Sequence, residues 1–225
     1  MKKSKLEIRV GARGWQYSDW AGEFYPDDLP EDWRFSYYSN EFHTVLVPYE
    51  TLALYEVDDW VDWAEDTQKN FTFYVEISGT ASWSEVKPYL ESLGAQLKGV
   101  VVVIEELNDV DALASLIKHL KSMTPVCIQR SGDAVSDQDM KTLQACHEVN
   151  ECWNGDSEAP VWGYGEAAIL LRDINEQNTP DKLRQIMEKG MEYAGKCDAI
   201  ALFFTGAAPK MSDMRTARTI TDLLV

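Results

Sequence analysis

Short apolar runs alternate with longer amphipathic stretches along the whole chain. The runs have the length and the β-branched and aromatic content of strands, and apolar residues recur at helical spacing in the stretches between them. Eight strands are expected, at residues 6–10, 42–47, 71–77, 99–105, 125–130, 148–153, 167–172 and 198–204. Seven helices are expected, at about residues 31–40, 57–68, 84–95, 108–122, 137–147, 180–194 and 212–224. Ser136 with Asp139, and Thr179 before Pro180, are signals for helix starts.

This alternation favours a parallel sheet with right-handed crossovers. Eight such units predict an α/β fold of the TIM-type (β/α)8 barrel class, formed by a single domain over residues 1–225. Glu148, Asn150 and Glu151 interrupt the sixth strand, and a Gly/Pro-rich loop follows it. We therefore expect one irregular strand unit around residues 148–166. An open doubly wound sheet is the alternative architecture.

The loop at residues 11–26 is the most unusual part of the sequence. It reads GARGWQYSDWAGEFYP and holds two Trp, two Tyr, one Phe and three Gly. Loops that a rigid scaffold positions commonly carry function, and aromatic side chains give them large rigid surfaces. Two interpretations stay open: a lid in which Trp15, Trp20 and Tyr25 close the barrel mouth, or a packed cap over one end of the domain. A second aromatic segment, residues 162–165, is a candidate for another lid.

The pattern G-x-x-G-W-x-Y-x-x-W-x-G-x-F-Y-P in this loop resembles the opening signature of the family called domain of unknown function 72, or YecE-like. The resemblance continues through Leu29-Pro30 and through residues 42–45, and it is weaker but colinear beyond about residue 105. It implies a (β/α) barrel and the location of a site. Because the biochemical activity of the family is not established, it implies no reaction.

The chain departs from the family pattern at several polar positions of the predicted strands. Leu46 stands where the family usually has an acid, and Glu76 stands where it usually has a Lys. Further departures are at Pro48, Val103, Ile128, Asp173 and Thr205. Since Leu46 cannot act as a general acid or base, catalysis that depended on the family's polar residues would be lost or changed here.

Charged residues occur at the carboxyl ends of the predicted strands, where α/β barrels have their sites. A guanidinium can hold a carboxylate or a phosphate through two hydrogen bonds, and aromatic rings can stack on a sugar. The sequence therefore predicts an uncharacterised barrel protein that binds a small anionic or sugar-like (polyol) ligand at this face. The predicted ligand-binding residues are Arg13, Trp15, Tyr17, Arg130 and Arg172. The candidate catalytic acid or base is Glu76.

Two functional interpretations stay open. The chain is either an enzyme acting on such a ligand, or a catalytically inactive barrel that serves as a binding or protein-interaction module. A purely structural alternative is that Arg130 and Arg172 neutralise Glu76 and Glu105 inside the barrel mouth, because buried charges must be paired.

Composition excludes several other classes of function. The net charge is −17, from 21 Lys and Arg against 38 Asp and Glu. This charge argues against nucleic acid and anionic membranes as partners, because both attract positive surfaces. No apolar run approaches the roughly 18 residues that span a bilayer. The four Cys form no C-x-x-C pair and the three His are scattered, so we expect no metal site, no cofactor and a cytoplasmic location.

Overall fold

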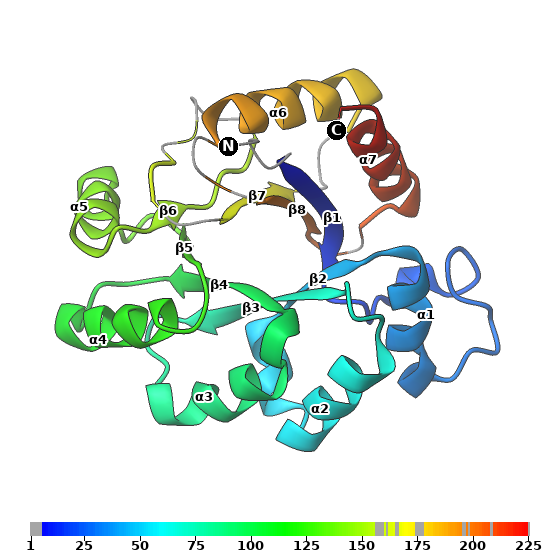
Figure 1. Cartoon of the computed structure of the whole chain (residues 1–225), viewed down its shortest axis with the longest axis horizontal. Helices are drawn as coiled ribbons and strands as arrows, with labels where there is room; N and C mark the ends of the chain where they lie inside the picture. Colours follow the sequence, from blue (N-terminus) through cyan, green and yellow to red (C-terminus); the bar gives the residue numbers. More distant parts are fainter. Residues whose placement is uncertain are drawn as a thin grey trace, which may run out of the picture.

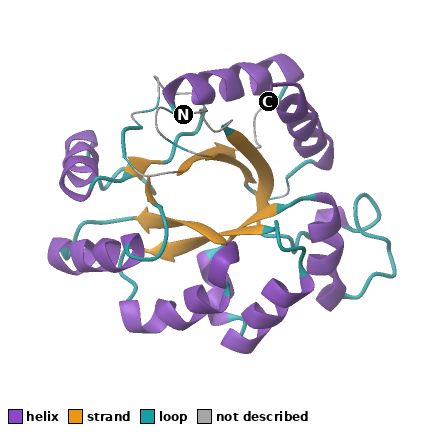
Figure 2. Cartoon of the chain, in the orientation of Figure 1, coloured by secondary structure: helices purple, strands orange, loops and turns teal. Residues whose placement is uncertain are grey.

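The fold is a curved parallel β-sheet with helices around its outside (Figures 1 and 2). A computed structural model describes residues 6–155, 160, 162–164, 167–173, 178–194, 197, 199–207 and 209–224, with the backbone alone described for 167–173. The sheet has eight strands in the order β6-β5-β4-β3-β2-β1-β8-β7. This order confirms the predicted α/β architecture of the TIM-barrel type.

Each predicted strand and helix is found close to its expected position. The strands are β1 (Glu7–Arg13), β2 (Thr44–Val47), β3 (Thr72–Ser78), β4 (Leu97–Ile104), β5 (Val126–Arg130), β6 (Asn150–Glu151), β7 (Ala167–Asp173) and β8 (Ala199–Thr205). The α-helices are α1 (Arg34–Glu41), α2 (Val57–Asp66), α3 (Trp83–Ser92), α4 (Val110–Lys121), α5 (Asp137–His147), α6 (Pro180–Tyr193) and α7 (Met211–Leu224). Short 3-10 helices are η1 (Ser18–Trp20), η2 (Glu31–Trp33), η3 (Tyr49–Ala53) and η4 (Gly94–Gln96).

The strands divide their side chains between two separate cores. A small cluster fills the inside of the curved sheet, and its members include Leu46, Tyr74, Val101 and Phe203. A larger cluster lies between the sheet and the helices. Side chains that are paired across parallel strands share a face, because successive residues of a strand alternate. Arg13 pairs with Leu46, and Glu76 pairs with Val101, so both charged residues face the inside of the sheet.

The sixth strand is the irregular unit that the sequence predicts. β6 has two residues, which pair with Cys127 and Ile128 of β5. Among the described residues, no ladder joins β6 to β7. The Asn150 side chain provides hydrogen bonds there instead, since its carbonyl oxygen accepts from the backbone N–H groups of Gly163 at 3.1 Å and Tyr164 at 3.0 Å.

The described residues of the aromatic segment at 162–165 lie beside β5 and β6. Gly163 and Tyr164 lie beside Thr124 and Pro125, at the amino-terminal end of β5, and Gly165 lies outside the described residues. The mouth is formed by the carboxyl ends of the strands, so Gly163 and Tyr164 lie toward the opposite end of the barrel. Trp162 instead donates from Nε1 to the carbonyl of Glu151, the last residue of β6, at 3.0 Å, and packs edge-on against Trp153.

The aromatic loop packs outside the sheet, beside α1 (Figure 1). Trp20 is 1% exposed, stacks on Tyr38 with ring centroids 6.1 Å apart, and donates from Nε1 to the Pro209 carbonyl at 2.6 Å. The Tyr38 hydroxyl accepts from the Ala12 N–H at 2.9 Å and donates to the Thr44 carbonyl at 2.8 Å. The loop is therefore part of the outer core, which favours the packed-cap interpretation over the lid.

Candidate functional site

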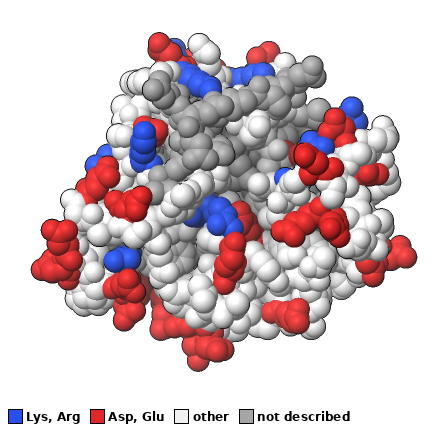
Figure 3. Space-filling view, turned by 180° about the vertical axis from the view of Figure 1, so that it is seen from behind, with Lys and Arg blue, Asp and Glu red and all other residues white. Residues whose placement is uncertain are grey.

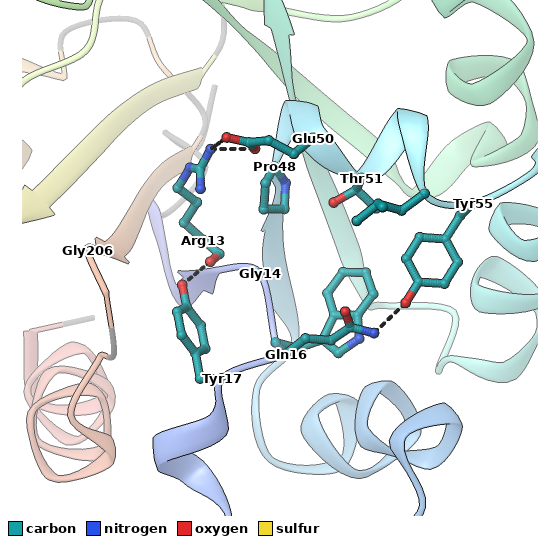
Figure 4. Close-up of a pocket in the computed structure, with 11 residues that line it drawn as sticks. Arg13, Gly14, Gln16, Tyr17, Pro48, Glu50, Thr51, Tyr55 and Gly206 are labelled. Carbon is teal, nitrogen blue, oxygen red and sulfur yellow. Dashed lines mark hydrogen bonds and ion pairs between the residues drawn. The ribbon is translucent and has the colours of Figure 1, made fainter.

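A cavity of about 260 Å³ opens at the carboxyl ends of β1, β2 and β8 (Figure 4). Its walls come from the start of the aromatic loop, from η3 and the residues that follow it, and from Gly206 after β8. The walls include the side chains of Arg13, Gln16, Tyr17, Glu50, Leu54 and Tyr55. Active sites of TIM-type barrels lie at this face of the fold.

Arg13 forms an ion-pair cluster with two carboxylates at this cavity. Its Nε donates to both carboxylate oxygens of Glu76, at 2.9 and 2.8 Å. Its Nη2 donates to both oxygens of Glu50, at 3.2 and 2.8 Å, and also lies 2.7 Å from Glu76 Oε2. The two carboxylates differ in exposure, because the Glu76 side chain is 5% exposed and that of Glu50 is 68% exposed. The cluster thus joins the buried interior to the solvent.

Burial and pairing act in opposite directions on this cluster. Burial raises the pKa of the Glu76 carboxyl, and the hydrogen bonds and charge of Arg13 offset only part of that rise. Burial alone would lower the pKa of Arg13, but the two carboxylates raise it above its ordinary value. Arg13 therefore stays charged, and its charge is opposed by two carboxylates.

Neighbouring groups fix the chain around Arg13. Gly14 turns the backbone with φ +83°, a conformation that favours glycine, and its N–H donates to the Leu46 carbonyl at 2.8 Å. The Tyr17 hydroxyl donates to the Arg13 carbonyl, and burial raises the pKa of Tyr17 to about 12. The Tyr17 side chain is therefore a neutral hydroxyl at ordinary pH. On the other wall of the cavity, Gln16 Nε2 donates to the Tyr55 hydroxyl (Figure 4).

The structure brings some of the predicted site residues together and separates others. Arg13, Trp15 and Tyr17 line the cavity, and Glu76 lies beneath it as the partner of Arg13. Arg130 does not line this cavity. Its Nη1 donates to Asp137 at the start of α5 and, at 3.2 Å, to the Val135 carbonyl.

The predicted positions of Arg172 and Glu105 have different outcomes. The backbone of Arg172, in β7, pairs with Phe204 of β8, and its side chain lies outside the described residues. Glu105 is exposed after β4. Among the described side chains, Glu76 pairs with Arg13, and Arg130 pairs with Asp137.

Gln16, Glu50, Thr51 and Tyr55 also line the cavity, and none of them is among the predicted site residues. Glu50 comes three residues after β2 and so meets the same strand-end criterion as Arg13. The hydroxyl and amide residues carry no comparable signal, because such residues are common in loops.

The part of the chain that the structure describes contains no group of three His, Cys, Asp or Glu side chains that could hold a metal ion. Cys127 and Cys152 lie in or against the interior cluster, and burial raises the pKa of Cys152 far above its ordinary value. Among the described helices, none is long and apolar enough to cross a membrane.

The family model described as "Protein of unknown function DUF72" matches residues 9–154. The chain belongs to the DUF72 family. The match confirms the YecE-like resemblance of the sequence. Among curated proteins, none matches this DUF72 chain.

Solved structures agree with this assignment. A DUF72 family protein from Thermotoga maritima MSB8 is 14% identical with a TM-score of 0.66, and the alignment covers 97% of this chain and 99% of that one. A DUF72 family protein from Enterococcus faecalis V583 is 12% identical with a TM-score of 0.65, with 99% of each chain covered. Phosphoribosyl anthranilate isomerase from Thermotoga maritima is 10% identical with a TM-score of 0.53, covering 97% of this chain and 99% of that one. At these identities the likeness shows the fold alone.

Proposed function

We propose that this DUF72 protein binds a small sugar-like ligand in the cavity beside Arg13. The observation that carries the proposal is a cavity at the barrel's usual ligand face whose walls combine hydroxyl, amide and aromatic groups over the Arg13–Glu76 pair. Its volume of about 260 Å³ lies slightly below the roughly 300–1,000 Å³ of ordinary ligand pockets, so the ligand should be small.

A polyol suits this cavity better than an anion. Arg13 is the positively charged residue of the described cavity wall, and it already donates to Glu50 and Glu76. An anionic ligand would have to displace Glu50 and then lie near both carboxylates. Hydroxyl groups can bind to the same wall without displacing any charge.

Binding without catalysis by Glu76 is the second candidate function. Both Glu76 oxygens accept from Arg13, and the carboxylate is 5% exposed. A general acid or base must reach the proton it transfers, and here the bond to Arg13 competes with such a transfer. In a binding module, Glu76→Gln should leave ligand affinity within about threefold of wild type, whereas an enzyme that uses Glu76 should lose turnover by about 100-fold or more.

Ligand retention by matched leucine variants tests the proposed cavity. Leu54 lies on the cavity rim and is 72% exposed, so Leu54→Trp should fill the opening without entering the core. Leu223, 81% exposed near the end of α7, gives the matched control Leu223→Trp. Native mass spectrometry and metabolite extraction should find a hydroxylated compound on the wild type and on Leu223→Trp, and lose it from Leu54→Trp. Equal retention by Leu54→Trp, or no bound or bindable polyol on any of the three, would contradict the proposal.

A further inference from the structure

We infer that the cavity selects a hydroxylated amine over neutral polyols and sugar acids, and that Glu50 receives the ammonium group of the ligand. This inference rests on the proposed function, because it assumes that the cavity binds a polyol. Beyond that function, the ligand is assigned a positive charge, and Glu50 is assigned as the residue that recognises it.

The charge balance of the cavity carries the first step. Of the described residues in its wall, Arg13 and Glu50 are charged, and Glu76 lies directly beneath them. One guanidinium and two carboxylates give +1 − 2 = −1. The cavity therefore carries a net negative charge although it contains an arginine, and a cationic group on the ligand would neutralise this charge.

Glu50 is the carboxylate that a ligand can reach. Its two oxygens accept from Arg13 Nη2, and its side chain remains 68% exposed at the cavity edge (Figure 4). A carboxylate offers about four lone-pair positions, so Glu50 can accept from an ammonium group while it still accepts from Arg13. Glu76 is 5% exposed and therefore shielded from the same ligand.

The rest of the wall suits a hydrogen-bond donor. Since Gln16 Nε2 donates to the Tyr55 hydroxyl, the carbonyl oxygen of Gln16 is the amide atom left to accept from a ligand. An ammonium group has three donors and no acceptor, so it suits the Glu50 carboxylate and the Gln16 carbonyl oxygen. Tyr17 and Tyr55 also present rings to the cavity, and a cation over an aromatic ring is attracted to its face.

The electrostatic field of the whole molecule also favours a cationic ligand. The net charge of the chain is −17. On the face seen in Figure 3, acidic side chains are widespread and basic ones are fewer. A negative surface raises the local concentration of cations and lowers that of anions.

Matched ligands that differ in charge test the inference by isothermal titration. The hexose set is glucosamine, glucose and glucuronate, and the three-carbon set is serinol, glycerol and glycerate. In each set that binds, the amine should bind about five- to tenfold more tightly than the neutral compound, and the acid should bind most weakly. Raising the salt concentration should reduce the advantage of the amine.

Glu50→Gln should remove this preference. The amine should lose about five- to tenfold in affinity, while the neutral compound changes by less than about twofold. Glu188→Gln is the matched control, because Glu188 also pairs with an arginine, Arg184, but lies on α6. A neutral or acidic compound that binds the wild type at least as tightly as its amine would overturn the inference, and so would a Glu50→Gln protein that keeps the preference. If no compound of any class binds, the proposed function itself fails.

Discussion

Replacing Arg13 by Met should lower the free energy of unfolding by about 3–5 kcal/mol. The change removes the guanidinium from Glu76, whose side chain is 5% exposed, and leaves that carboxylate without its charged partner. Methionine keeps most of the aliphatic stem, so lost packing contributes little. Urea denaturation of wild type and variant at about pH 7 measures the difference.

The pH dependence of this loss has a definite sign. Burial raises the pKa of Glu76, so its contribution to stability is fully present below the unfolded-state pKa and is lost as the pH rises through the folded-state pKa. Removing Arg13 removes a group that lowers this pKa, so the pKa should rise further. The difference in the free energy of unfolding between wild type and Arg13→Met should therefore shrink as the pH falls from about 7 toward about 5.

Arg130→Met provides the control for this prediction. Arg130 also pairs with a carboxylate, but its partner Asp137 is 79% exposed, so the loss should stay within about 1 kcal/mol. If Arg13→Met were as mild as Arg130→Met, or if its deficit grew at lower pH, the assignment of Arg13 as the partner that stabilises Glu76 would be wrong.

Replacing Trp20 by Ala should also cost about 3–5 kcal/mol. Trp20 is 1% exposed, stacks on Tyr38, contacts Phe24 and donates to the Pro209 carbonyl. The variant would leave a cavity in the outer core and an unpaired carbonyl. Thermal unfolding followed by circular dichroism is the measurement.

The matched control is Trp33→Ala. Trp33 lies in η2, close in sequence to the aromatic loop, but it is 66% exposed, so its removal should change stability by no more than about 0.5 kcal/mol. A Trp20→Ala protein as stable as Trp33→Ala would mean that the loop does not act as a structural part of the barrel.

Local sequence signals were sufficient for the elements of the fold. Ser136 and Asp139 form the predicted capping box of α5, and the Thr179 side chain accepts from the Lys182 N–H at the start of α6. The charged and amide residues at 148–151 correctly indicated a weak sixth strand. These signals are local, and local chemistry decides where a helix or a strand begins and ends.

Contacts between distant parts of the chain were harder to predict. The aromatic content of residues 11–26 was evident, but the partner of Trp20 is Pro209, which is 189 residues away in sequence. Sequence patterns indicate that such a loop buries aromatic surface, and they do not show which side of the sheet it covers.

The candidate site was predicted in part for the same reason. The strand-end rule selected Arg13 and Glu76, which form an ion pair. It also selected Arg130, which pairs with Asp137 at the start of the next helix. Glu50 also follows a predicted strand end, but its contact with Arg13 depends on how the ends of β1 and β2 lie in space. The role of Arg172 stays a prediction, since its side chain lies outside the described residues.

Observation of the Arg13 side chain during ligand binding tests whether the Arg13–Glu76–Glu50 cluster forms the ligand site. Its Nε–H, which donates to Glu76, should give a protected signal in arginine-selective ¹H–¹⁵N spectra, assigned by its absence from Arg13→Lys. Titration with the tightest compound of the matched panel should shift this signal saturably and leave that of Arg184, on α6, unchanged. A compound that saturates the protein without moving the Arg13 signal, or that moves Arg184 as much, would contradict a ligand site built on the Arg13–Glu76–Glu50 cluster.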